Sequence, residues 1–94
     1  MEEIIIDQEI FQGSKILTSH ASILMIKAKE GFLGCGYFDV ETADRLNEPV
    51  AIVTDVKSYE DMLSAKVVRL SKAAQAKGLE EGILGKEALS LLNK

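Results

Sequence analysis

The sequence predicts an α+β fold with a mixed, largely antiparallel sheet of about five strands and helices packed on one face. Short apolar runs separated by turn residues fill the first half of the chain, as is typical of strands. Capping signals and apolar residues at helical spacing fill the second half. With 94 residues, the chain is expected to form one domain over 1–94.

Isoleucine-rich segments predict the first three strands. Three consecutive isoleucines between acidic residues in 2–7 suit a short strand. Gly13 is expected to interrupt the pattern, and a second strand follows over 14–19. The uniformly apolar segment 23–26 predicts a third strand that is buried on both faces.

A hairpin is expected over 22–38, with its turn at 29–31, because Gly31 can adopt the positive φ that a tight turn needs. The fourth strand is then expected over 32–38. It carries Cys35 between two glycines. Glycine inside a strand often marks a place where another group approaches the backbone closely.

A strand, helix, strand unit is predicted after this hairpin. Asp39 is expected to cap a short helix that ends near Asn47. Val40, Ala43 and Leu46 are expected on one face of this helix. The apolar segment 50–53 is the next strand. Because the connection between these strands contains a helix, the two strands are expected to be parallel.

The rest of the chain is predicted to be helical. Ser58 followed by Asp61 is typical of a helix N-terminus. A break near 63–64 allows two helices in the next segment, and Gly78 is expected to end a helix. The last helix is expected over 85–92. Apolar residues at helical spacing predict a buried stripe before Gly78: Leu63, Val67, Leu70 and Ala74.

Composition and net charge indicate which classes of binding partner and which cellular location to expect. A net charge of −4 argues against nucleic acid as a partner, because phosphate binding depends on clustered Lys and Arg. No apolar run approaches the roughly 20 residues that cross a membrane, so no membrane association is expected. A single cysteine forms no intramolecular disulfide, which favours a cytoplasmic location.

The sheet face left without helices must be polar or meet a partner. The two uniformly apolar strands leave little polar surface there. We therefore expect a homo-oligomer, with a dimer as the simplest form.

Cys35 is the first candidate for chemistry. A thiolate nucleophile there would pair with His20 or Asp39, and these three residues are the catalytic candidates. The alternative is a small buried thiol, since free cysteine is among the most buried residue types. Asp39 has the alternative role of helix cap, and His20 that of a surface residue. One histidine and one cysteine are too few for a structural zinc site, so no metal site is predicted, and the sequence identifies no cofactor.

The second candidate for a functional site is a ligand groove beside the glycine backbone on either side of Cys35. The segment 82–88 places Gly85 and Lys86 at a helix start, where backbone N–H groups favour anions. It lacks the spacing of a P-loop, and a tight turn into the last helix is the alternative. The candidate ligand-binding residues for a small molecule are Gly34, Cys35, Gly36, Asp39, Gly85 and Lys86.

Two segments, 31–36 with Asp39 shortly after and 82–89, resemble the YunC-like family, a small bacterial and archaeal domain family of unknown function. The resemblance covers nearly the whole chain. It implies an α+β fold with a mixed sheet and implies no activity. Family-typical positions would be Cys35, Gly36, Asp39, Gly82, Gly85, Glu87 and Ala88.

The sequence is compatible with three functions. The first is a small ligand-binding or regulatory module that acts as a homo-oligomer. The second is a cysteine-dependent enzyme that uses Cys35. The third is a structural or interaction subunit without a ligand.

Overall fold

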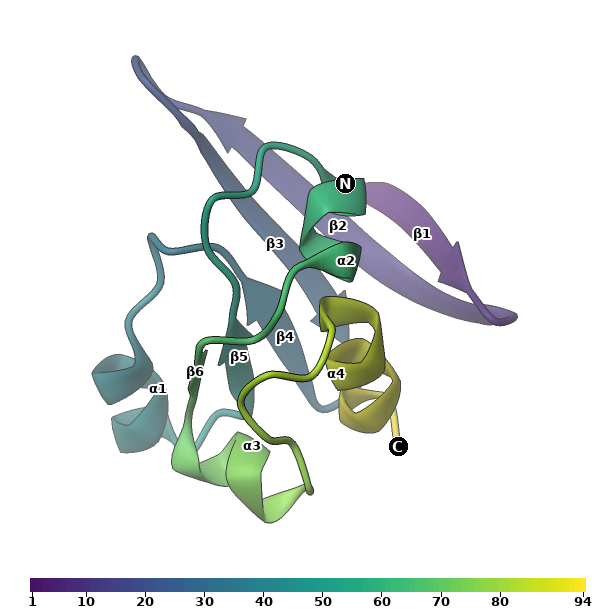
Figure 1. Cartoon of the computed structure of the whole chain (residues 1–94), viewed down its shortest axis with the longest axis vertical. Coiled ribbons are helices and arrows are strands. Elements are labelled where there is room, and N and C mark those ends of the chain that lie inside the picture. The colour runs from purple at the N-terminus through teal and green to yellow at the C-terminus, as the bar shows by residue number, and fades with distance from the viewer.

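The computed structural model describes all 94 residues and is organised around a six-stranded sheet with the order β1-β2-β3-β4-β5-β6 (Figure 1). The pairing of β4 with β5 is parallel, and all other neighbours are antiparallel. The mixed, largely antiparallel sheet is therefore confirmed, with six strands where about five were expected. The strands are β1 (Glu2–Ile6), β2 (Glu9–Leu17), β3 (Ser22–Ala28), β4 (Gly31–Gly34), β5 (Val50–Ile52) and β6 (Arg69–Leu70).

Four helices complete the α+β fold. They are α1 (Val40–Leu46), α2 (Tyr59–Ser64), α3 (Lys72–Ala76) and α4 (Gly85–Leu92). In Figure 1, α2 and α4 lie side by side over one face of the sheet, and α1 lies apart from them beside the short strands. None of the helices has the length and apolar content that a membrane crossing requires.

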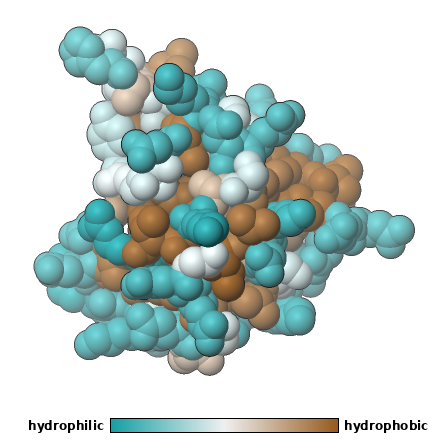
Figure 2. All heavy atoms as spheres, in the orientation of Figure 1, coloured by the Kyte–Doolittle hydropathy of each residue, from teal (hydrophilic) through white to brown (hydrophobic).

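The main core lies between the sheet and helices α2 and α4. Phe11, Leu24 and Leu33 come from the sheet and are fully buried, as are Met62 and Leu89 from the helices. Figure 2 shows the side of the molecule that carries α2 and α4. Apolar side chains are visible there over β1 and in gaps between the polar side chains of the surface.

One helix departs from the predicted arrangement. Ala43 of α1 packs in a second cluster with Val50 and Ile52, whereas Ala51 belongs to the main core. Because side chains alternate along a strand, α1 lies on the face opposite to α2 and α4. Leu46 was expected on one face with Val40 and Ala43, but it is 69% exposed whereas Ala43 is buried.

Helix ends follow the local signals in the sequence. Asp39 accepts a hydrogen bond from the N–H of Glu41 at 3.0 Å, and α1 ends at Asn47 in the left-handed conformation. Ser58 accepts one from the N–H of Asp61 at 3.1 Å at the start of α2. Gly78, at φ 96°, follows α3. Helix α4 has the predicted bounds.

The prediction that Gly13 interrupts a strand is wrong. Gly13 lies inside the strand and pairs with Ile26 of β3, so it does not interrupt the strand. A Cβ at this position would come within 2.7 Å of the side chains of Ile4 and Tyr59. The missing side chain therefore lets Tyr59 of α2 pack on the sheet. Burial raises the pKa of Tyr59, and the nearby carboxylate of Glu2 raises it further.

Two other strand predictions also need correction. The fourth strand ends at Gly34, because Phe38 folds back over that glycine and stacks edge-on against Phe32, with ring centroids 5.1 Å apart. The third strand is not buried on both faces, since Ile23 and Met25 remain half-buried on the side without α2 and α4.

The apolar stripe from Leu63 to Ala74 is not one helix face. Helix α2 ends at Ser64, and the chain forms β6 before α3 begins. The chain is held here by Ser71, which is fully buried. Its hydroxyl accepts the N–H of Val50 at 2.9 Å and donates to the carbonyl of Glu48 at 2.7 Å.

Replacing Ser71 by alanine should lower the free energy of unfolding by about 1–3 kcal/mol, because the buried N–H of Val50 loses its partner. Urea unfolding followed by circular dichroism measures this loss. Ser19→Ala is the matched control, since Ser19 is exposed and its hydroxyl has no hydrogen bond in the structure. Equal stability of the two variants would contradict the assigned role of Ser71.

Candidate functional site

Two adjoining hollows lie where β4 and β5 end. Because these strands are parallel, their carboxyl ends reach the same edge of the sheet, where ligand sites form in α/β proteins. The hollows measure about 390 and 500 Å³. We call them together the strand-end cleft, which is lined by His20, Ala21, Ser22, Cys35, Gly36, Tyr37, Thr54, Asp55, Val56 and Lys57.

Each wall of the cleft comes from a different part of the chain. Ala21 and Ser22 lie at the turn into β3, and Cys35 and Gly36 follow β4 directly. Four residues after β5 supply the wall opposite the turn, and they are Thr54, Asp55, Val56 and Lys57. Asp55 and Val56 line both hollows, as do Ala21 and Ser22, so the two hollows form one continuous surface.

Several polar side chains of the cleft have no partner within the chain. The hydroxyls of Ser22 and Thr54 and the carboxylate of Asp55 take part in none of the side-chain hydrogen bonds of the structure. Asp55 also has φ 60°, in the left-handed region that few non-glycine residues adopt. Three other non-glycine residues of the chain share this conformation, which Asp and Asn adopt more readily than other residues, so the φ of Asp55 marks a sharp bend after β5.

Cys35 forms part of the floor of the cleft and is only 5% exposed. Its Sγ accepts a hydrogen bond from the N–H of Leu24 at 3.3 Å, and its own N–H donates to the carbonyl of Leu24 at 3.1 Å. His20 lines the second hollow, which does not include Cys35. This geometry favours the packed thiol over a Cys35–His20 catalytic pair.

The other candidates fall outside the cleft. Phe38 occupies the space beside Gly34. The carboxylate of Asp39 caps α1 and accepts a second hydrogen bond from the hydroxyl of Thr42 at 3.1 Å. Lys86 lines a separate hollow on α4. The structure thus brings together Cys35 and Gly36 of the six candidate ligand-binding residues.

Gly85 has a clear packing role. A Cβ at this position would collide with the carbonyl oxygen of Met62, and the N–H of Gly85 donates to the carbonyl of Ala65 at 2.8 Å. The glycine therefore lets the start of α4 approach the backbone of α2 closely. This contact explains the residue without any ligand.

Sequence reasoning missed the polar wall of the cleft. Thr54 and Asp55 follow an apolar strand that was already expected to run parallel to β4. Polar residues directly after such a strand are the signal that would have found them. No three His, Cys, Asp or Glu residues are grouped closely enough to hold a metal ion.

The fold and the cleft define a small α+β domain with a candidate ligand site beside one parallel strand pair. The model of the family described as domain of unknown function (DUF1805) matches residues 34–92, and the chain belongs to this family. The family match covers part of the cleft, from Cys35 to Lys57, and omits β1, β2 and β3.

A crystal structure of a protein of unknown function, TA1206 from Thermoplasma acidophilum, is similar to the whole fold. The TM-score is 0.92 at 34% sequence identity, over 97% of this chain and 89% of the archaeal one. No curated protein matches the chain. The resemblance to the YunC-like family is compatible with these findings, which do not themselves carry that name.

Cys35 should react slowly with an alkylating reagent in the folded protein, because its thiol is buried against Leu24. We expect a rate on the order of a hundredfold or more below that of the urea-unfolded chain, since reaction requires local opening. Mass spectrometry of quenched samples gives both rates. A folded chain that reacts as fast as the unfolded one would instead support the nucleophile hypothesis.

Gly85→Ala should destabilise the protein by about 1–3 kcal/mol or more, because the new methyl group is forced against the backbone of α2. Gly36→Ala is the matched control, since a Cβ there makes only an ordinary contact, 3.5 Å from the methyl group of Thr54. Its free energy of unfolding should stay within about 0.5 kcal/mol of the parent value. The reverse order of the two effects would refute the packing role.

Proposed function

We propose that this chain is a small ligand-binding or regulatory module whose ligand lies in the strand-end cleft. The observation that carries the proposal is the set of unpartnered hydroxyl and carboxylate groups, from Ser22, Thr54 and Asp55, around one hollow. Polar groups that converge on a concave surface provide the orientation and selectivity of small-molecule sites.

The chemistry of the lining favours a small polar ligand. Asp55 supplies a negative charge and Lys57 a positive one, while Ser22 and Thr54 supply hydroxyls that both donate and accept. Apolar contact comes from Val56 and the half-exposed ring of Tyr37. A ligand with a cationic or hydroxyl group near Asp55 and an anionic group near Lys57 would match these charges.

A cysteine-dependent enzyme receives less support from this geometry. Cys35 is covered and already hydrogen-bonded, and His20 lies in the other hollow. We infer that Cys35 and Gly36 shape the floor of the cleft, because small residues leave the volume above them free. The cleft itself is open to solvent.

A thermal-shift screen against amino acids, sugars, nucleotides and small carboxylic acids tests the proposal. Asp55→Asn keeps a residue that tolerates the left-handed conformation and removes the charge. Because hydrogen bonds to charged groups are worth about 1.5–3 kcal/mol, a ligand held by Asp55 should bind about tenfold or more weakly to this variant.

Glu30→Gln is the control for the charge change, since Glu30 lies in the turn between β3 and β4 and does not line the cleft. It should leave the ligand affinity unchanged. A screen in which no class of ligand raises the melting temperature would count against the proposal. The same holds if a ligand is found whose affinity falls equally in both variants.

A further inference from the structure

The sheet has an apolar face that neither the main core nor α1 covers. On the side away from α2 and α4, strands β1 and β2 present Ile5, Ile10 and Ile16, which are 68%, 58% and 62% exposed. Ile5 and Ile10 are direct cross-strand partners, and so are Ile16 and Ile23. Several large aliphatic residues on one face of a sheet typically mark a surface that meets another protein.

Charges on this face are arranged in a row across three strands. Glu3 of β1 pairs with Gln12 of β2, and Gln12 pairs with Lys27 of β3. The row therefore begins with an acid on the edge strand β1 and ends with a base on the inner strand β3. Since directly paired residues share a face, all three side chains lie on the same side as Ile5 and Ile10.

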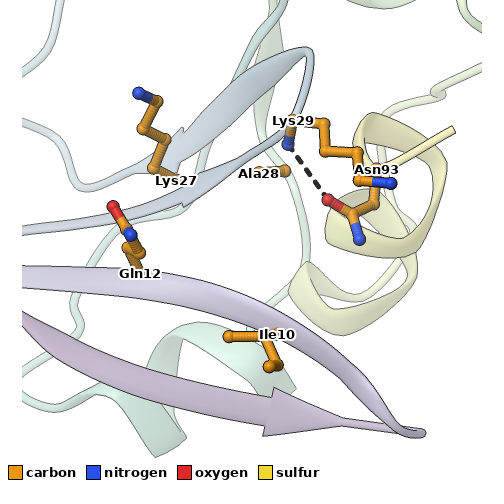
Figure 3. A pocket seen from close by; sticks show the side chains of 6 residues that line it. All are labelled: Ile10, Gln12, Lys27, Ala28, Lys29 and Asn93. Atoms are coloured by element: carbon orange, nitrogen blue, oxygen red, sulfur yellow. Dashed lines mark hydrogen bonds between the residues drawn. The ribbon is translucent and has the colours of Figure 1, made fainter.

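A hollow of about 260 Å³ adjoins the basic end of this row. Figure 3 shows Lys27, Gln12 and Ile10 around it, with Lys29 near the end of α4, where its N–H donates to Asn93 Oδ1 at 3.0 Å. Two lysines and no acidic residue line this hollow. The carboxylate of Glu9 lies beside the hollow and accepts a hydrogen bond from Asn93 Nδ2 at 3.3 Å, whereas Lys27 forms no ion pair within the chain. Lys27 can therefore meet a carboxylate brought from outside.

We propose that a second copy of this chain covers the face, related by a two-fold axis that runs along β2 between the two sheets. This rotation places β1 of each subunit opposite β3 of the other subunit. Glu3 then lies opposite Lys27 of the partner subunit, and Lys27 lies opposite the partner's Glu3. Ile10 and Ile16 lie on β2, next to the axis. Ile10 therefore faces the partner's Ile10, and Ile16 faces the partner's Ile16.

The physical dimensions allow this pairing. Neighbouring strands lie about 4.8 Å apart and stacked sheets about 10 Å apart, so glutamate and lysine side chains span the gap between the two faces. Stacked sheets are rotated by about 30°, which such long side chains tolerate. A two-fold interface must be self-complementary, and a row that runs from acid to base meets this requirement.

The charge pattern favours a second copy over other occupants. A nucleic acid or an anionic membrane would need a face of uniform positive charge, whereas this row carries both signs. The cleft residues are not part of this face, so the dimer and the proposed ligand site are independent. Loss of one would leave the other intact.

Light scattering coupled to size-exclusion chromatography tests the dimer, and the parent chain should elute with twice the mass of the 10.3 kDa protomer. Glu3→Lys and Lys27→Glu should each weaken the dimer roughly tenfold, because each creates two like-charge contacts in place of two opposite ones. The double variant Glu3→Lys/Lys27→Glu should recover the parent affinity. Glu80→Lys, an exposed charge near α3, should have no effect.

Ile10→Asp supplies a second test, since it places two carboxylates against each other on the axis and should give a monomer with an unchanged circular dichroism spectrum. A parent chain that is monomeric would overturn the proposal. So would a dimer that tolerates Ile10→Asp and both charge reversals, as expected if the edges of β1 pair instead. Failure of the double variant to restore the dimer would also overturn it.

Discussion

The parallel pairing of β4 with β5 is the constraint on which the rest of the structure depends. The N–H of Phe32 donates to the carbonyl of Pro49 at 3.1 Å, and that of Val53 donates to Gly34 at 2.9 Å. A side chain at Gly31 would collide with the Pro49 carbonyl, so the two segments approach this closely only because glycine is present. The pairing brings the residues after both strands to one edge, and the strand-end cleft exists for that reason.

The same pairing divides the apolar residues between two faces. Leu33 and Ala51 are register partners and point into the main core, whereas Phe32 and Val50 are partners on the opposite face. Helix α1 lies in the connection between the two strands and covers the second face only near β4 and β5. The apolar side chains of β1 and β2 on that face therefore have no cover within the chain. Helix α1, which connects the two strands, is thus too short to cover the whole of this second face.

Local signals predicted most of the elements, with β6 (Arg69–Leu70) as an exception, and distant contacts decided where they end. Caps such as Asp39 and Ser58 act within a few residues, so the helix starts were readable from the sequence. The effects of Gly13 and Gly34 depend on Tyr59 and Phe38, which reach these glycines only after folding. For the same reason, the sequence predicted only part of the cleft. The glycines around Cys35 indicated its floor, which Cys35 and Gly36 form, but nothing in the sequence shows that the residue after Thr54 has a positive φ.

The family match and the cleft do not have the same limits. Residues 34–92 contain the floor and the polar wall, but Ala21 and Ser22 come from the start of β3, outside the matched segment. Strand β3 is held in the sheet by β2 and β4 and contributes Leu24, whose backbone bonds twice to Cys35. A complete cleft therefore requires the N-terminal strands. The archaeal structure matches nearly the whole chain and is therefore a better structural comparison for the complete cleft than the family match.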